Sequence, residues 1–372
     1  MIIPNISVKS ILTVCLLLLV NSSYGVVIDQ EPQENVKIGL LITDAQSVAA
    51  RDAATLAIKK ANSGGGYRGR PFELLVRSME GPWGTGSKQA VSLIFDENVC
   101  AIIGSHDGRN AHLVEQVAAK ERFVFLSAWA DDPTLSQAFV PWFFNCVPND
   151  NQQSHRLAGE IFVKRKIRKA AFISDNSYDS KMALNSFLRE IKSTGNSEPI
   201  QLFYDNQTRD FSSIIQAIIR QKAECVVLSG QPHSQVKIIQ LIHKNNIPIP
   251  LFCTLSLLDD KEFSEDDLKI CESSIIVSSG HWLGKTGSDF RNEFVKTFGY
   301  EPGAVAAYAY DAANMLIEAI RKGGLERENI RKSLSEIKHD GVTGQISFDE
   351  KGNRKGEVLL MEIKSGIQVP VR

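Results

Sequence analysis

Short apolar runs alternate with amphipathic stretches along most of the chain. In the first half, strands are predicted at 36–42, 72–76, 99–103 and 123–126, and helices at 48–62, 87–95 and around 113–118. The strand runs are short and mainly apolar, and the helices repeat apolar residues at helical spacing on one face. Strands that alternate with helices in this way indicate a parallel sheet with helices on its faces.

The same alternation starts again after 148–150. Here the predicted helices are 152–164, 181–193, 211–221 and 235–244, and the predicted strands are 170–173, 200–204, 225–228, 251–252 and 274–277. Further helices are predicted at 288–298, 304–322 and 327–337, followed by strands at 345–348 and 358–363 that a turn joins. No low-complexity linker separates the two α/β units, so we expect two lobes that pack together.

The first 25 residues have the layout of a secretory signal peptide. Lys9 precedes an uncharged apolar run at 11–20, and small residues follow at Ser23 and Gly25. The run is shorter than the roughly 20 residues that cross a bilayer. A signal anchor that stays uncut is the alternative. Cys15 follows a valine inside the run, which argues against a lipid anchor, and we expect a periplasmic or extracellular protein.

Composition excludes several classes of protein. Lys and Arg number 42 against 43 Asp and Glu, and a net charge of -1 argues against nucleic-acid binding. The 43% of hydrophobic residues is ordinary for a soluble globular protein. Without Cys15, an odd number of cysteines remains, so at least one is unpaired. Cys253 and Cys271 could form a disulfide, which the sequence leaves open.

No enzyme motif is complete in this chain. The stretch 81–88 (GPWGTGSK) lacks a lysine directly after its last glycine, as a phosphate-binding loop requires. The glycines at 64–66 precede a strand and favour a tight turn over a dinucleotide site. His106 and His112 are interpreted as surface side chains, not metal ligands. We therefore expect no catalytic residues, no metal and no cofactor.

Ligands of open α/β sheets bind at the loops that follow the strands. Two tryptophans in these loops offer ring faces, three aspartates offer acceptors, and Arg109 offers a bidentate donor. This mixture favours a small polar ligand that is cationic or zwitterionic. Helix capping is the alternative role for the aspartates at 131–132. The candidate ligand-binding residues are Asp44, Trp83, Ser105, His106, Asp107, Arg109, Trp129, Asp131, Tyr178 and Gln231.

Four motifs in the same order resemble a known family. They are the turn and strand at 61–74 (AN, then GGGYRGRPFEL), the strand at 99–104 (VCAIIG), the helix at 305–313 (AAYAYDAA within it) and the hairpin at 341–354 (GVTG, FD and GNR). Behind a signal peptide, they resemble the type I periplasmic substrate-binding proteins of the leucine/isoleucine/valine-binding class. The resemblance covers nearly all of the chain after residue 25.

The resemblance implies a fold, a partner and a mode of action. It implies two Rossmann-like lobes with parallel sheets flanked by helices, joined by a three-strand hinge that closes over a small molecule. Lobe 1 would comprise 36–146 and 280–340, and lobe 2 would comprise 147–279 and 341–372. A monomeric, non-catalytic protein would deliver its ligand to an ABC-type permease in the membrane. The alternatives are a sensing module that signals occupancy to a partner and an exported α/β enzyme.

The sequence departs from the family pattern at the positions that hold the ligand. In amino-acid-binding members, Ser and Thr hydroxyls in the loops after the third and fourth strands hold the ligand carboxylate. Here those loops read SHDGR (105–109) and SAWAD (127–131), with Asp131 near the family's Thr. Tyr178 matches a family Tyr, but Asp179 replaces the Gly that follows it. An amino acid other than free leucine, isoleucine or valine, or a related amine or amide, is therefore the predicted ligand.

Overall fold

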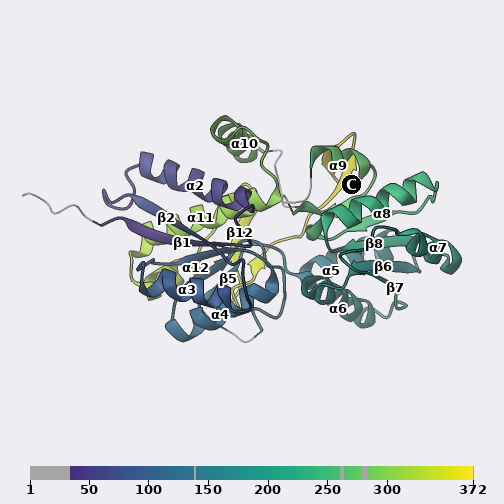
Figure 1. Cartoon of the computed structure of the whole chain (residues 1–372), viewed down its shortest axis with the longest axis horizontal. Coiled ribbons are helices and arrows are strands. Elements are labelled where there is room, and N and C mark those ends of the chain that lie inside the picture. The colour runs from purple at the N-terminus through teal and green to yellow at the C-terminus, as the bar shows by residue number, and fades with distance from the viewer. Residues whose placement is uncertain (1–33, 138–139, 260–263, 279–283, 372) are drawn as a thin grey trace, which may run out of the picture. The chain divides into compact units, whose positions relative to one another are not determined.

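The computed structural model describes residues 34–137, 140–259, 264–278 and 284–371 (Figure 1). The predicted signal peptide, with Cys15, lies outside the described residues, as does the predicted lobe boundary at 280. Among the helices of the described ranges, none combines the length and apolar character needed to cross a membrane.

The first sheet contains five parallel strands in the order β2-β1-β3-β4-β5. The strands are β1 (Val36–Ile42), β2 (Phe72–Ser78), β3 (Ile102–Ser105), β4 (Phe125–Ser127) and β5 (Phe143–Asn145), and helices α2 (Val48–Ser63), α3 (Thr85–Phe95) and α4 (Gly108–Glu121) connect the first four. All residues of β3 and all but one of β1 are buried. A sheet covered by helices on both faces requires such continuous apolar runs.

The second sheet contains seven strands in the order β15-β14-β10-β9-β8-β6-β7. Its strands are β6 (Ala170–Asp175), β7 (Ile200–Tyr204), β8 (Cys225–Ser229), β9 (Leu251–Cys253), β10 (Ile275–Val277), β14 (Leu360–Lys364) and β15 (Ile367–Pro370). The flanking helices are α5 (Asp150–Ala158), α6 (Tyr178–Ser193), α7 (Ser212–Gln221), α8 (Pro232–Lys244) and α9 (Glu265–Ile270) (Figure 1). Only β14 runs opposite to the other strands, and its pairings with β10 and β15 are antiparallel, so the sheet is parallel-rich.

Three more helices and a small antiparallel sheet complete the described chain. They are α10 (Lys285–Phe298), α11 (Ala304–Gly323) and α12 (Arg327–Ser335), with β11 (His339–Gly341), β12 (Gly344–Phe348) and β13 (Arg354–Lys355). Helix α11 packs along α2 (Figure 1). Its many alanines combine high helix propensity with side chains small enough for close approach.

A buried carboxylate fixes the turn between β11 and β12. Asp311, in the middle of α11, is not exposed and accepts hydrogen bonds from the backbone N–H groups of Val342 and Thr343, each at 2.8 Å. The Thr343 hydroxyl donates a third bond to the same carboxylate, at 2.6 Å. Gly341 must be glycine here, because a Cβ atom would lie 2.5 Å from the carboxylate. Asp311 therefore joins α11 to the segment that leads into the last strands.

The predicted fold class is confirmed: the structure has two parallel-rich sheets flanked by helices. Strand β5 was not predicted, because its three residues are too few for a periodic signal. The helix predicted at 152–164 is α5 followed by a π-helical segment at Gly159–Lys164. Segment 344–355 packs beside β5, through a bridge between Asn145 and Asn353. The lobe boundaries stay a prediction.

The five cysteines of the described ranges are free thiols. The disulfide between Cys253 and Cys271, which the sequence left open, is not formed. Both side chains are fully buried, and burial raises the pKa of the Cys271 thiol to about 12. Inert buried thiols of this kind contribute to packing, not to chemistry.

Candidate ligand-binding site

The strand orders place two crevices at the carboxyl edges of the sheets. In the first sheet the order changes direction between β1 and β3, and in the second between β6 and β8. Such switch points are where open α/β sheets bind their ligands. Helix α4 begins after β3 and helix α6 begins after β6, so both helices point their N-termini out of these edges.

The first turns of α4 and α6 are in contact. The backbone N–H of Gly108, the first residue of α4, donates to Asp179 Oδ1 in the first turn of α6, at 3.1 Å. Gly108 leaves no room for a side chain: a Cβ atom would lie 2.7 Å from Asp132 Cβ and 2.9 Å from Asp179 Oδ1. Asp107 caps the same helix by accepting the Asn110 N–H, at 2.9 Å. Two aspartate side chains therefore accept hydrogen bonds from backbone N–H groups at the N-terminus of α4.

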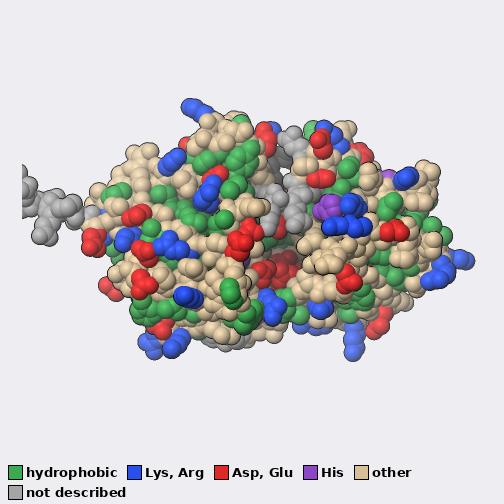
Figure 2. All heavy atoms as spheres, viewed as in Figure 1, with side chains coloured by type: hydrophobic (Ala, Val, Ile, Leu, Met, Phe, Trp, Pro, Cys, Tyr) green, Lys and Arg blue, Asp and Glu red, His purple; other side chains and the backbone are tan. Residues whose placement is uncertain are grey.

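Four aspartates gather around this contact: Asp131 and Asp132 after β4, Asp150 at the start of α5, and Asp179. Asp150 is 1% exposed, its carboxyl group lies against that of Asp131, and its Oδ2 atom accepts no hydrogen bond from any described group. Figure 2 shows acidic side chains gathered in a hollow of the face drawn, between the elements labelled β5 and α5 in Figure 1.

Burial and mutual repulsion raise the pKa of three of these carboxyl groups. Burial raises the pKa of Asp131 to about 6, from an ordinary 3.8. Burial, followed by the charge of Asp131, raises the pKa of Asp150 and of Asp179 well above the ordinary value. Like charges in a dry site favour the protonated form. The cluster therefore holds protons at a pH where surface aspartates hold none.

Gln153 fixes the position of Asp131. Its amide Nε2 donates to Asp131 Oδ2 at 2.9 Å and to the Pro148 carbonyl at 3.0 Å. Its Oε1 accepts the backbone N–H of Leu255, at 2.9 Å. The backbone carbonyl of Asp131 accepts the N–H of Asp150, at 2.8 Å. The two carboxyl groups are thus held against each other by a fully hydrogen-bonded frame.

Asp132 keeps its charge through a different set of partners. Its carboxylate accepts hydrogen bonds from His112 Nε2 at 3.0 Å, the Tyr178 hydroxyl at 2.8 Å and the Thr134 hydroxyl at 2.7 Å. These bonds outweigh burial and lower the pKa of Asp132. The same bond, with a second that His112 donates to Glu115, raises the pKa of His112 to about 9. Asp132 also accepts the Thr134 N–H, so it caps a turn, and no described helix starts there.

Aromatic rings lie on two sides of the aspartates. Trp129 packs edge-on against Tyr308, with ring centroids 6.2 Å apart. The guanidinium group of Arg354 lies 5.7 Å from the centre of the Tyr308 ring. Trp83 is different: it is 65% exposed, and the Arg109 guanidinium stacks on it at 4.2 Å. Trp83 and Arg109 therefore form an exposed pair beside the first turn of α4.

The remaining predicted residues have mainly structural contacts. Ser105 ends β3 and is buried. Asp44 accepts the Gln46 N–H and the Ser47 hydroxyl in a turn before α2. The interpretation of His106 as a surface residue was wrong, because its ring is 1% exposed and stacks on Phe125. Burial lowers the pKa of His106.

Gln231 precedes α8, and its backbone N–H donates to Asp175 Oδ2 at 3.0 Å. The structure thus brings Asp107, Asp131 and Tyr178 into one cluster with Asp132, Asp150 and Asp179. Whether the ten predicted residues contact a ligand stays a prediction.

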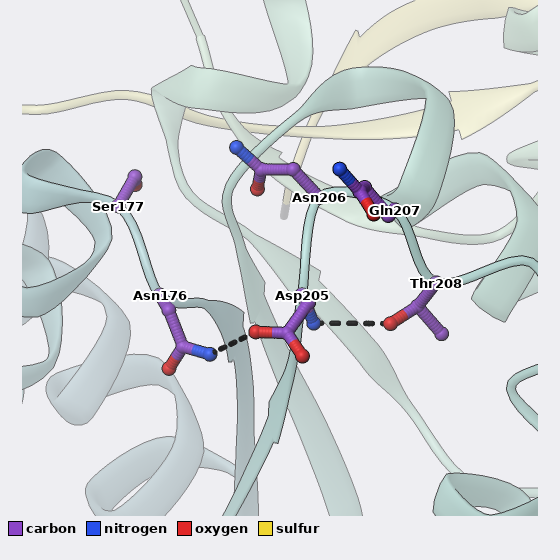
Figure 3. Close-up of a pocket in the computed structure, with 6 residues that line it drawn as sticks. All are labelled: Asn176, Ser177, Asp205, Asn206, Gln207 and Thr208. Atoms are coloured by element: carbon purple, nitrogen blue, oxygen red, sulfur yellow. Dashed lines mark hydrogen bonds between the residues drawn. The ribbon is translucent and has the colours of Figure 1, made fainter.

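A second hollow lies at the ends of β6 and β7 and has a volume of about 600 Å³ (Figure 3). Its lining residues are Asn176, Ser177, Asp205, Asn206, Gln207 and Thr208. Asn176 donates to Asp205 Oδ1 at 2.8 Å, and the Asp205 N–H donates to the Thr208 hydroxyl at 3.0 Å (Figure 3). The lining contains no aromatic or apolar side chain, so it lacks the surface that a small-molecule site normally offers. Within the described ranges, no group of His, Cys, Asp and Glu could hold a metal ion.

A model of the family described as periplasmic binding protein matches residues 35–367. The chain belongs to the periplasmic binding protein family. Members of this family bind a substrate without catalysis, which agrees with the prediction that the chain is not an enzyme. The match covers every residue of the aspartate cluster and both sheets up to the first residue of β15.

Similar proteins bind small molecules that carry a carboxylate. The chain is 25% identical, over 86% of its length and 87% of the relative, to a Leu/Ile/Val-binding protein homolog of Brucella suis. A substrate binding protein of a branched-chain amino acid transporter from Streptococcus pneumoniae, in complex with isoleucine, is 19% identical with a TM-score of 0.78, over 90% of this chain and 97% of that one. A solute binding protein from R. palustris in complex with benzoate is 17% identical with a TM-score of 0.77, over 91% and 95%. These likenesses show the fold.

Sequence reasoning missed part of the cluster. Asp150, Asp179, His112 and Gln153 were not predicted. Asp150 and Asp179 each stand in the first turn of a helix, where an acidic residue is ordinarily explained by the helix dipole. The signal that could have found Asp179 is its place directly after Tyr178, where the family has Gly.

Proposed function

We propose that this protein is an exported solute-binding protein that captures a small amine- or amide-bearing ligand and delivers it to an ABC-type permease. The ligand would lie between lobe 1 (36–146 and 280–340) and lobe 2 (147–279 and 341–372), and the lobes would close over it about a hinge. Solute binding proteins of ABC transporters from Rhodopseudomonas palustris and Desulfitobacterium hafniense share the fold, which supports the permease as partner.

The observation that carries the proposal is the pair formed by Asp131 and Asp150. Two carboxyl groups lie against each other, both have a raised pKa, and Asp150 Oδ2 lacks a hydrogen-bond donor among the described residues. A protonated amine supplies three N–H donors and a positive charge. Placed between the two groups, it would satisfy the unpartnered oxygen and remove the repulsion through charge-assisted hydrogen bonds.

The aromatic neighbours fit the same ligand class. Trp129 lies two residues before Asp131 in the loop after β4, and its ring is partly exposed. A ring face next to carboxylates attracts a cation and packs against its carbon skeleton. A ligand with a protonated amine and a short apolar part would use both features. The ligand we propose is an amino acid derivative or related amine without a free carboxylate at this position.

The charge of the cluster argues against the ligand type that the relatives bind. Isoleucine, leucine and benzoate, found in similar structures, all present a carboxylate. In this chain, a carboxylate ligand would meet Asp131, which is ionised at pH 7.5 because its pKa is about 6, and would lie close to Asp107 and Asp179. Two unit charges about 4 Å apart repel by roughly 4 kcal/mol at a protein surface. That cost favours an amine or amide over the corresponding acid.

A thermal-shift screen of residues 26–372 at pH 7.5 tests this proposal with matched ligands. Leucinamide and leucine share a side chain, and 1,4-diaminobutane and succinate share a chain of four carbons. A ligand at 100 times its dissociation constant adds about 2.7 kcal/mol of stability. We expect members of the amine and amide group to raise the unfolding temperature and their carboxylate partners to have no effect.

A matched variant separates specific binding from general charge effects. Asp131→Asn should abolish the shift caused by the amine, whereas Asp210→Asn, at an exposed aspartate before α7, should retain it. Stabilisation by leucine, succinate or benzoate but by no amine would overturn the proposal.

A further inference from the structure

One hydrogen bond joins the N-terminus of α4 to α6, and it is made by a carboxylate. The Gly108 N–H is among the first N–H groups of α4, which have no partner within the helix. Such groups, with the helix dipole, bind anions. Asp179 Oδ1 lies 3.1 Å from this N–H, at the position that an anion bound to the helix would take.

Carboxyl groups already crowd the first turn of α4. The Gly108 Cα is so close to Asp132 and Asp179 that an added Cβ would lie 2.7 and 2.9 Å from them. The next amide of the turn with an assigned partner, that of Asn110, donates to Asp107. A carboxylate from outside would have to displace the Asp179 side chain and stand beside the charge of Asp107.

We propose that Asp179 is a specificity-determining residue, which occupies the anion-binding end of α4 and thereby excludes ligands that present a carboxylate there. This inference rests on the proposed function, because it concerns the same cleft. Asp179 lies in the first turn of α6. Its hydrogen bond with Gly108 therefore also connects this turn to the first turn of α4. Asp150 Oδ2 is buried and has no donor among the described residues.

The test compares two substitutions at one position. Asp179→Ala removes the carboxyl group that lies at the N-terminus of α4. It keeps a residue with high helix propensity in the first turn of α6. Asp179→Asn keeps a side-chain oxygen that the Gly108 N–H can reach and removes only the ability of the side chain to ionise. Circular dichroism and the unfolding temperature without ligand establish that each variant folds, and binding of leucine, benzoate and acetate is then measured by calorimetry at pH 7.5.

We expect the alanine variant to bind at least one of these carboxylates at least tenfold more tightly than the wild-type protein. The asparagine variant should resemble the wild type, because its side chain still fills the site. Equal gains in both variants would show that charge, not occupancy, excludes carboxylates, and would overturn the inference. No gain in a folded alanine variant would overturn it as well. If only the asparagine variant folds, the result is taken from that variant alone. Carboxylate affinity equal to that of the wild type supports exclusion by occupancy, and higher affinity refutes it.

The outcome is distinguishable from failure of the proposed function. The proposed function fails if the wild-type protein binds no amine or amide, whatever Asp179→Ala does. The specificity inference fails if the wild-type protein binds an amine and the alanine variant acquires no carboxylate affinity.

Discussion

Replacing Asp131 by asparagine should make the protein more stable at pH 7.5 and less able to bind. The side chain of Asp131 is held against that of Asp150, and burial raises its pKa to about 6. The Gln153 amide can donate to the amide oxygen of the new side chain as it does to the aspartate, so the substitution removes charge and keeps the frame.

The magnitude follows from linkage between proton binding and folding. A carboxyl group with a pKa of 3.8 in the unfolded chain and about 6 in the folded protein costs about 3 kcal/mol when it is ionised. Because the folded pKa is raised, this cost is absent below pH 3.8, develops as the pH rises toward 6, and is complete above. The neutral amide avoids it at every pH.

Thermal unfolding between pH 4 and pH 7.5 measures this effect. We expect the two proteins to unfold at similar temperatures near pH 4 and the variant to gain about 6 °C at pH 7.5, at roughly 2 °C for each kcal/mol. Asp210→Asn is the control: hydrogen bonds from Ser212 lower the pKa of Asp210, so this variant should gain no stability. A difference in unfolding temperature that does not change with pH, or a less stable variant at pH 7.5, would refute the reasoning.

Three further predictions concern the frame around the site. Gly108→Ala should lower the free energy of unfolding in urea by about 1–3 kcal/mol, because a Cβ atom would overlap Asp132. An unchanged urea midpoint would contradict this close packing around Gly108. Asp311→Ala should lower the free energy of unfolding by about 2–4 kcal/mol in the same assay, since it leaves two buried N–H groups and the Thr343 hydroxyl without an acceptor. Wild-type stability of this variant would show that Asp311 does not stabilise the turn between β11 and β12. The raised pKa of His112 means that its contact with Asp132 stabilises fully below pH 6.5 and is lost as the pH rises through about 9. His112→Gln should remove that loss of stability from the pH profile of thermal unfolding, and an identical profile would count against the ion pair.

The sequence predicted the sheets better than the site. The run 170–173 is apolar throughout, and 36–42 is interrupted only by Lys37, because both faces of each sheet are covered; this pattern can be recognised without a structure. Strand β5 was not predicted, because three residues are too few to show a periodic pattern. Loop positions after the strands were also predictable, because topology alone places them at the ligand edge.

The partners of the loop residues could not be predicted. Asp150 follows Asn149 in a helix-capping sequence, and nothing local distinguishes it from an ordinary first-turn aspartate. Its meeting with Asp131 and Asp179 depends on how α4, α5 and α6 converge, which no periodicity records. His106 shows another limit of the sequence: it was interpreted as a surface side chain, yet its ring is buried and packs on Phe125.

The most direct test of the account is the number of protons released when an amine binds. Calorimetry at pH 6 in two buffers of different ionisation enthalpy, with the amine of largest thermal shift, gives this number. The ligand arrives already protonated, so a cation seated between Asp131 and Asp150 must lower their pKa and release a proton. The account predicts net release in the wild-type protein and less in Asp131→Asn. Binding without release, or with proton uptake, would show that the ligand does not sit between these carboxyl groups.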